Sequence, residues 1–223
     1  GHGFGRISEY DLVKREKDYI EFSLKWSEDT LKVYPWKFQL NIAYALKDNE
    51  VEVIWKVKNL DDKEMFYSIG AHTAFRCPLV QGEDFSDYYL AFNQAEDNVN
   101  MPLNSKGQFL KDPGKAPLQG QTMDLNYEMF KGDALAYKAL KSDEVTICSR
   151  KSDKKVTMMA KDYPFWGFWT PAQGGAPFLC IEPWAGHADF ADFTGELKDK
   201  DSICRVRAGS SFSAGYSIII HEA

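Results

Sequence analysis

Glu182 is the residue whose surroundings most call for a chemical explanation. It lies in the run PFLCIEPWAGHADF, after four apolar residues and directly before Pro183 and Trp184. A carboxylate in such a run either lies at a strand end facing water or is held in a pocket for a purpose. Acid–base chemistry needs a partner for such a group, and histidine is the most common one. The chain has only four histidines, so each can be weighed.

The four histidines lie in different contexts. His72, in YSIGAHTAF, follows an alternating stretch, and taken alone it fits a core or strand-end histidine better than a catalytic one. His2 lies in GHGFGR, four residues before Arg6, where incidental charges at a flexible end are the plain explanation. His187 could line the same mouth as the carboxylate, although a loop exit is its ordinary place. His221 falls on the same face of the predicted last strand as its small and polar residues, so we expect it at the surface.

Aromatic side chains are dense around these residues. Trp166 and Trp169 lie in YPFWGFWTP, and Trp184 adjoins the carboxylate. Most aromatic residues belong to cores. Gly167, however, interrupts the alternation, and a strand glycine lets a ring or a ligand approach the backbone closely. Flat apolar faces beside a few polar groups suit a sugar, whose ring has apolar C–H faces and a rim of hydroxyls.

Composition narrows the class of protein. The 223 residues are 44% hydrophobic and 27% charged, which is ordinary for a soluble globular chain, and no apolar run is long enough to cross a membrane. The net charge of −6 argues against nucleic acid as a partner. The four cysteines (Cys77, Cys148, Cys180 and Cys204) are widely spaced, which favours buried thiols in a cytoplasmic protein over a zinc site or disulfides. Metal and nucleotide motifs are absent, so we expect no cofactor.

Alternation of apolar and polar residues dominates the chain. It predicts a hairpin over 38–46 and 51–57, a strand over 65–69, a second hairpin around 145–147 and 156–158, and a last strand over 212–220. A short helix is expected over Asp124–Gly132. The stretch 99–123, rich in Pro, Gly, Asn and Lys, predicts a long surface excursion. Many strands with few helices imply an all-β, sandwich-like fold.

Six motifs then occur together in order: HGFGR, LKVYPWKFQLNIAYAL, YSIGAHTAF, GDALAYKAL, FWGFWT and CIEPWAGHADF. In this order and spacing they resemble the aldose 1-epimerase family, specifically the LacX-like branch of the galactose mutarotase-like group. The resemblance covers essentially the whole chain. It implies one domain over 1–223 with a large antiparallel β-supersandwich. It also implies an isomerase that interconverts the α and β anomers of a monosaccharide, an aldose, without a metal or organic cofactor.

The resemblance also implies site residues: His2, Arg6, His72, Glu182 and, as the best match for the family aspartate, Asp133. Two positions depart from the family pattern, namely Ala71 in place of a glycine and Thr73 in place of a proline. The first motif, HGFGR, also lies at the start of the given sequence, whereas members of the family carry a substantial further N-terminal portion before it. We therefore expect the N-terminal strands of the family domain to be absent here, and a separate N-terminal chain or fragment to complete the fold.

The implied roles form an acid–base mechanism. Glu182 would be the base and His72 the acid, on opposite sides of the anomeric carbon. Reference pKa values of about 4.3 for glutamate and about 6.5 for histidine would leave the base ionised and the acid protonated. His2 and Arg6 would orient the sugar and Asp133 would hold a hydroxyl, while Trp184 or Trp169 would offer a stacking face.

Three other functions remain open at this stage. A non-catalytic carbohydrate-binding or sensing protein could use the same fold. A glycosidase could use Asp133 and Glu182, but that scheme leaves the histidines unexplained. A hexose-phosphate mutarotase would need a basic cluster at the pocket rim to bind the phosphate group.

Overall fold

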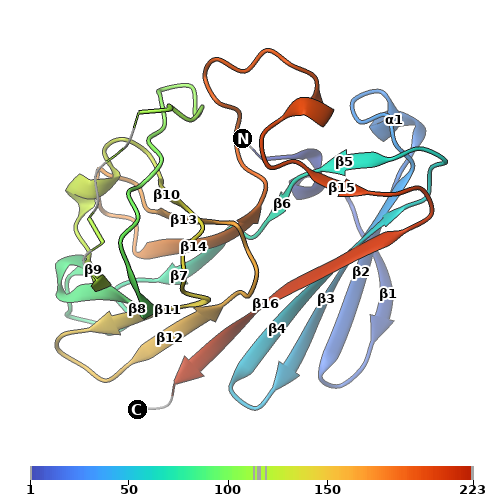
Figure 1. The fold of residues 1–223 in the computed structure, drawn as a ribbon. Helices are drawn as coiled ribbons and strands as arrows, with labels where there is room; N and C mark the ends of the chain where they lie inside the picture. Colours follow the sequence, from blue (N-terminus) through green and yellow to red (C-terminus); the bar gives the residue numbers. More distant parts are fainter. Residues whose placement is uncertain (1, 113, 115–116, 119, 222–223) are drawn as a thin grey trace. The chain divides into compact units, whose positions relative to one another are not determined.

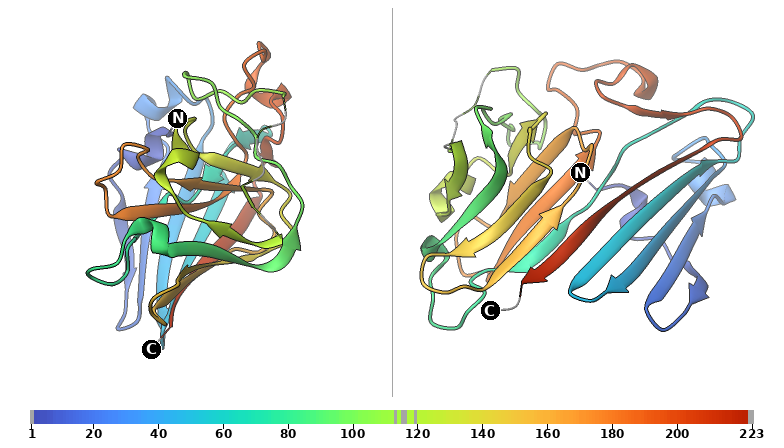
Figure 2. Two further views of the ribbon diagram at one scale, coloured as in Figure 1. Left: turned by 90° about the vertical axis from the view of Figure 1, so that its left-hand side faces the viewer. Right: turned by 60° about the horizontal axis from the view of Figure 1, so that its bottom comes forward.

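The computed structural model describes residues 2–112, 114, 117–118 and 120–221. The chain forms two compact units (Figures 1 and 2). The first comprises Gly1–Tyr67 and Cys204–Ile218, and the second comprises Ser68–Ile203 and Ile219–Ala223. Almost all regular structure is antiparallel β, as the alternation predicts. The assignment of 1–223 to a single domain stays a prediction.

The first unit is built on a meander of antiparallel strands. Its strands are β1 (Asp11–Arg15), β2 (Tyr19–Lys25), β3 (Phe38–Lys47), β4 (Glu50–Asn59), β5 (Met65–Tyr67) and β15 (Cys204–Val206). Two short helices, η1 (Phe4–Arg6) and α1 (Glu28–Leu31), lie before β1 and β3. The predicted first hairpin is confirmed, because β3 and β4 pair from Phe38↔Asn59 to Lys47↔Glu50. Asp48, at a φ of 50°, begins its two-residue turn.

The last strand, β16 (Ser211–His221), is also confirmed and follows β4 in the sheet order. The strand predicted over 65–69 is wrong in one respect, because it is interrupted at Ser68. Its two parts are β5, which pairs with β15, and β6 (Ile69–Gly70), which pairs with β14 (Phe178–Ala185). The interruption passes the chain from one sheet to another just before His72.

The second unit has two sheets. One has the order β12-β11-β8-β9, with β8 (Tyr88–Glu96), β9 (Gly120–Asp124), β11 (Glu144–Ser149) and β12 (Lys155–Met159). The other has the order β10-β13-β14-β6, with β10 (Leu135–Lys138) and β13 (Phe165–Trp169), and β7 (Thr73–Arg76) also pairs with β14. The predicted second hairpin is confirmed by the pairing Val145↔Met158. The rings of Phe92 on β8 and Phe168 on β13 lie 5.8 Å apart, so the sheets pack together over an apolar core.

Two expectations for the second unit need correction. The surface excursion expected over 99–123 holds only in part: among its described residues Lys106 and Lys111 are exposed, but Phe109 and Met123 are fully buried and the stretch ends within β9. The helix expected over Asp124–Gly132 is only the 3-10 turn η3 (Tyr127–Phe130), which Asn126 caps by accepting a hydrogen bond from the Met129 N–H. Two further 3-10 turns are η2 (Phe85–Asp87) and η4 (Leu197–Asp199).

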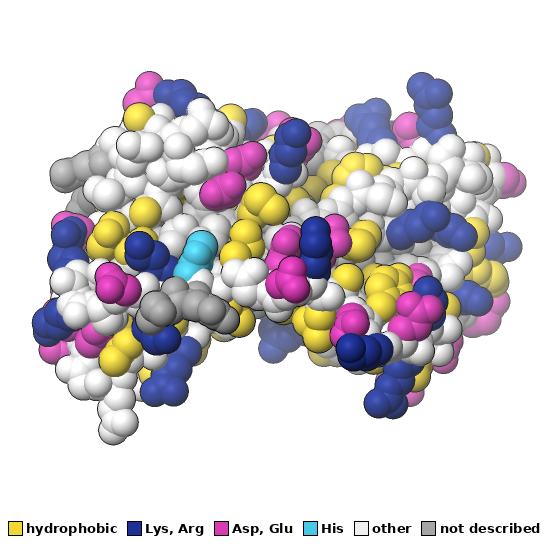
Figure 3. Space-filling model, turned by 90° about the horizontal axis from the view of Figure 1, so that it is seen from below, with side chains coloured by type: hydrophobic (Ala, Val, Ile, Leu, Met, Phe, Trp, Pro, Cys, Tyr) yellow, Lys and Arg dark blue, Asp and Glu magenta, His cyan; other side chains and the backbone are white. Residues whose placement is uncertain are grey.

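The surface carries mixed charge. Figure 3 shows acidic and basic side chains interspersed with apolar ones on the face that it presents. Within the described residues, no helix has the length and apolar character needed to cross a membrane.

Candidate active site

Strand β14 explains why Glu182 lies in an apolar run. Side chains alternate between the two faces of a strand, so Cys180, Glu182 and Trp184 share one face while Leu179 and Ile181 share the other. Leu179 and Ile181 are completely buried. Glu182 is on the opposite face from them, yet it is only 6% exposed because neighbouring strands flank it on both sides. The carboxylate is therefore buried within the sheet and does not lie at a strand end facing water.

His72 lies beside this carboxylate, in the two-residue link between β6 and β7. Its Nδ1 atom is 3.1 Å from Oε1 of Glu182. The imidazole is 42% exposed, whereas the carboxylate is buried, so a ligand can reach the pair from the histidine side. The two groups contact each other directly in this structure, rather than standing apart on either side of an open space.

Trp184 is held against the same carboxylate. Its Nε1–H donates a hydrogen bond of 3.1 Å to Oε2 of Glu182. The indole extends across two neighbouring strands, and a Cβ added at Gly167 would lie 2.2 Å from its Cζ2 atom. A Cβ added at Gly70 would lie 2.7 Å from Cδ1. Glycine at both positions therefore lets the ring lie close over the backbone, as the sequence suggested for Gly167.

The electrostatics of the pocket favour a strong base. Burial raises the pKa of Glu182 from 4.5 to about 7, and the hydrogen bond from Trp184 and the nearby thiol of Cys180 lower this pKa in part. The negative charge of Asp133 raises it further. The value near 4.3 expected from the sequence is therefore too low, because the sequence does not show how completely the carboxyl group is removed from water.

Cys180 is a member of the site that the sequence analysis missed. The potential ligand atoms of His72, Cys180 and Glu182 all lie within 4.8 Å of one another. Such donors suit Zn²⁺. Burial nevertheless raises the pKa of the thiol to about 12, and His72 already contacts Glu182 directly. We therefore interpret them as a proton-carrying cluster. The spacing of two residues between Cys180 and Glu182 was the available signal.

Two further predicted residues lie in the same unit. Asp133 precedes β10, is exposed, and has a φ of 83°, with its carboxylate accepting a hydrogen bond from the Ala134 N–H. Its negative charge raises the pKa of Glu182. Trp169 is half-buried on β13, directly opposite Cys180, and its ring stands edge-on to His72 with 6.3 Å between centroids.

His2 and Arg6 belong to the first unit. Both are exposed, and Arg6 ends η1, where the ring of Phe4 packs against Tyr34 and Phe38. Their contact with a sugar stays a prediction.

The remaining histidines have structural surroundings. His187 is buried, with Nε2 2.9 Å from Oδ2 of Asp201 and Nδ1 beside the carbonyl of Ala188. Its expected place at a loop exit is correct, but it is not simply a loop residue facing solvent. His221 is half-buried, and its Nε2 lies 2.8 Å from the hydroxyl of Thr157.

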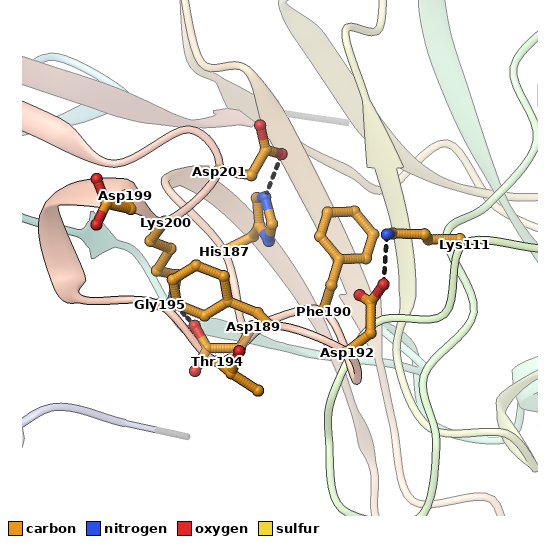
Figure 4. Close-up of a pocket in the computed structure, with 11 residues that line it drawn as sticks. Lys111, His187, Asp189, Phe190, Asp192, Thr194, Gly195, Asp199, Lys200 and Asp201 are labelled. Atoms are coloured by element: carbon orange, nitrogen blue, oxygen red, sulfur yellow. Dashed lines mark hydrogen bonds and ion pairs between the residues drawn. The ribbon is translucent and has the colours of Figure 1, made fainter.

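A cavity of about 480 Å³ lies beside His187 (Figure 4). It is lined by Lys111, His187, Asp189, Phe190, Asp192, Phe193, Thr194, Gly195, Asp199, Lys200 and Asp201. Its cations are paired with its acids, as in Lys111–Asp192 and Lys200–Asp189. Neither His72 nor Glu182 lines this cavity, so it is separate from the acid–base cluster.

Comparison with known proteins gives a consistent result. The sequence model of the family described as aldose 1-epimerase matches residues 1–202. Chromosomal protein LacX of Lactococcus lactis subsp. lactis is 34% identical over 223 residues, covering 98% of this chain and 74% of LacX. The crystal structure of a galactose mutarotase related enzyme from Lactobacillus acidophilus superposes with a TM-score of 0.90 at 31% identity, covering 99% of this chain and 73% of that one. A galactose mutarotase-like protein from Lactobacillus casei shares the fold, with a TM-score of 0.91 at 24% identity and coverage of 98% and 75%.

Proposed function

Because this chain belongs to the aldose 1-epimerase family, we propose that it interconverts the α and β anomers of a free aldose by acid–base opening and closing of the sugar ring. The observation that carries this proposal is the direct contact between a buried carboxylate, Glu182, and a partly exposed imidazole, His72. Mutarotation requires one group that takes a proton and one that gives a proton, and this pair supplies both.

The proposed reaction conserves protons. Glu182 takes the proton of the anomeric hydroxyl while His72 gives a proton to the ring oxygen, and the bond between that oxygen and C1 breaks. The open-chain aldehyde rotates about C1–C2. The ring then closes on the other face of the carbonyl, with His72 taking back the hydroxyl proton and Glu182 returning its own. The 3.1 Å contact must open, or be bridged by the sugar, for these transfers to occur.

The pKa of Glu182 supports its role as the base. A general base works best when its pKa lies near the working pH, because it is then both sufficiently ionised and sufficiently basic. Burial brings this pKa to about 7, whereas an ordinary glutamate would be a much weaker base. The direct contact with His72 also means that the two groups titrate as a pair.

Trp184 and Asp133 are the proposed sugar-holding residues of the second unit. The indole of Trp184 is partly exposed and hydrogen-bonded to the base, so a sugar stacked on it would have its anomeric hydroxyl near Glu182. The carboxylate of Asp133 is exposed and can accept a hydroxyl proton in a hydrogen bond. Trp169, which stands against His72, is the second aromatic wall.

The test compares the wild type with Glu182→Gln on freshly dissolved α-anomers. Glutamine keeps the size of glutamate and one acceptor oxygen but cannot take up a proton at neutral pH. We expect kcat to fall about 10²- to 10⁴-fold with little change in sugar affinity, and His72→Asn to act in the same direction. Polarimetry measures the exchange and calorimetry measures the binding, on a panel of aldoses and aldose phosphates.

Glu96→Gln is the matched control. Glu96 is also buried in the second unit, but its carboxylate accepts hydrogen bonds from the Lys141 and Ser142 backbone N–H groups, which is a structural role. This variant should exchange anomers at the wild-type rate once folded. A wild type that binds aldoses without exchanging them would instead support the carbohydrate-sensing alternative. Exchange confined to aldose phosphates would support the hexose-phosphate alternative.

A further inference from the structure

We propose that Arg76 binds an anionic group at the end of the sugar remote from C1, so that an aldose bearing a phosphate or a carboxylate there is exchanged in preference to the neutral aldose. This inference rests on the proposed function and narrows its substrate class. It concerns a residue that lies beyond the acid–base pair and outside the set implied by the family resemblance.

Strand β7 presents one face to solvent, and this face continues the acid–base site. His72, Ala74 and Arg76 are exposed, whereas Phe75 and Cys77 are buried. Since side chains alternate between the two faces of a strand, the exposed residues share one face and the buried residues share the other. The arginine therefore lies on the face from which a ligand reaches the histidine.

Strand β14, which lies beside β7, supplies the neighbouring part of this face (Figure 1). Ala74 is directly opposite Cys180, and Arg76 is directly opposite Phe178. Directly opposite residues of an antiparallel pair lie on the same side of the sheet. Cys180 also shares its face with Glu182, two residues further along β14. The arginine and the proposed base are thus on one face of one sheet.

The space between the arginine and the acid–base pair suits a sugar with a substituent. His72 and Arg76 are four residues apart, which is roughly 13 Å along a strand. Ala74, between them, is small and exposed, so it leaves the face open. The ring of Trp169 adjoins this stretch, with centroid distances of 6.3 Å to His72 and 5.8 Å to Phe178. A sugar against this aromatic wall, with C1 at the acid–base pair, can direct its far end towards the guanidinium.

The charge of Arg76 is available to a ligand. Among the residues that the structure describes, no acid pairs with it, whereas Arg150 of the same unit pairs with Asp124. A guanidinium presents five N–H donors in a planar fork that matches the oxygens of a phosphate or a carboxylate. A sugar hydroxyl carries no compensating charge. An exposed and unpaired guanidinium on the face of the site therefore favours an anionic sugar.

The test uses sugars that differ only in the group at C6. Glucose and galactose are compared with their 6-phosphates and their uronates, and polarimetry gives kcat/KM for each. We expect the wild type to prefer the anionic member of each set. A preference confined to the phosphates identifies a phosphate site, and one shared with the uronates identifies a site for either oxyanion.

Arg76→Met removes the charge and keeps a long apolar side chain. The ratio of kcat/KM for the anionic sugar to that for the neutral sugar should fall about 10- to 100-fold, as expected for losing hydrogen bonds to a charged group. The fall should lie in KM, because this contact is made equally before and during the reaction. Added salt should raise the KM of the anionic sugar in the wild type but not in Arg76→Met.

Two further variants serve as controls. Arg76→Lys keeps the charge but not the planar fork, so it should retain part of the preference. Arg150→Met removes an arginine next to β11, in the other sheet of the unit, and should leave the ratio unchanged. A variant that only folded poorly would lower both rates alike, so the ratio separates binding from stability.

The proposal is overturned if the wild type has equal kcat/KM for neutral and anionic sugars, or if Arg76→Met leaves their ratio unchanged. Failure of the proposed function has a different signature, in which no sugar of either kind is exchanged. Calorimetry with 1,5-anhydroglucitol and its 6-phosphate then decides, because these probes lack the anomeric hydroxyl and bind without reacting. Tighter binding of the phosphate that is lost in Arg76→Met supports the site, and equal binding by both proteins overturns it.

Discussion

The chemistry proposed here depends on how one carboxyl group is kept from water. Glu182 is buried by the parity of β14 and by strands on both sides of it, and burial moves its pKa from 4.5 to about 7. A glutamate that is easy to ionise would stabilise the fold but would be a weak base. The same burial that makes Glu182 useful as a base therefore makes its ionised form costly to the folded protein.

This cost predicts a pH-dependent difference in stability between the wild type and Glu182→Gln. The folded protein binds the Glu182 proton more tightly than the unfolded chain does, so this group favours folding below pH 4.5. That contribution is lost as the pH rises towards about 7. Relative to the glutamine variant, the wild type should lose up to about 3 kcal/mol of unfolding free energy over this range, less whatever protonated His72 restores.

Urea unfolding of both proteins at about pH 5 and about pH 8 measures this difference. Glu96→Gln serves as the control for removing a buried carboxylate. A wild-type-to-variant difference that stays constant with pH would show that Glu182 is not a carboxyl group of raised pKa.

At the scale of elements, the site depends on a row of residues across one sheet. Gly167 on β13 is directly opposite Glu182 on β14, and Gly70 on β6 is directly opposite Trp184. These two glycines leave room for the indole to cross its neighbouring strands and reach the carboxylate. The sheet thus shapes the site in two ways: it supplies the side chains of the site, and its two glycines leave space for the indole.

Gly167→Ala should therefore displace Trp184. The added Cβ would lie 2.2 Å from the ring, which is far inside contact distance, so the ring must move and its hydrogen bond to Glu182 must lengthen or break. We expect sugar affinity to fall about 10-fold, because the displaced indole no longer offers its face to the sugar. Tryptophan fluorescence and calorimetric binding measure the two effects.

Gly132→Ala provides the control, since an added Cβ there meets no atom within 4 Å. Wild-type binding by Gly167→Ala would mean that the sugar does not use the indole.

A second element, the segment from Gly186 to Ile203, depends on His187. Its ring is packed among Phe109, Phe165 and Phe190, and it is hydrogen-bonded to Asp201. His187→Ala should cost about 3 kcal/mol through lost packing and the loss of its contact with the Ala188 carbonyl, and should speed amide hydrogen exchange in this segment. Asp201→Asn should cost under ~1 kcal/mol, because that side chain is 45% exposed and its ion pair is screened by water. Equal effects of the two variants would contradict this assignment.

For the whole molecule, burial predicts the reactivity of its thiols. Cys77, Cys148 and Cys180 are buried and Cys204 is half-buried, and all four are free. Burial raises the pKa of each thiol, to about 12 for Cys77 and Cys180. Since the thiolate is the reactive form, the folded protein should be alkylated slowly, and first at Cys204.

Mass spectrometry of peptides after brief alkylation, with and without denaturant, measures this order. Denaturant should make all four cysteines react alike. Rapid native alkylation of Cys180 would mean that the acid–base cluster is open to solvent on that side, contrary to its burial.

The sequence by itself determined the strand pattern and the family. Alternation with a period of two is a local property, so the hairpins at 38–59 and 144–159 could be predicted directly. Glu182 and His72 were likewise found from local motifs, which also carry the resemblance to the aldose 1-epimerase family.

Only the tertiary structure decided how these residues act together. The proximity of Cys180 to the Glu182–His72 pair, the course of the indole over Gly167, and the burial of His187 by Phe109 all join segments far apart in the chain. Local alternation does not contain this information, because it states which face a side chain takes but not which strand lies beside it. The pKa of Glu182 likewise could not be predicted from local alternation, because the carboxyl group is removed from water by neighbours from several segments together.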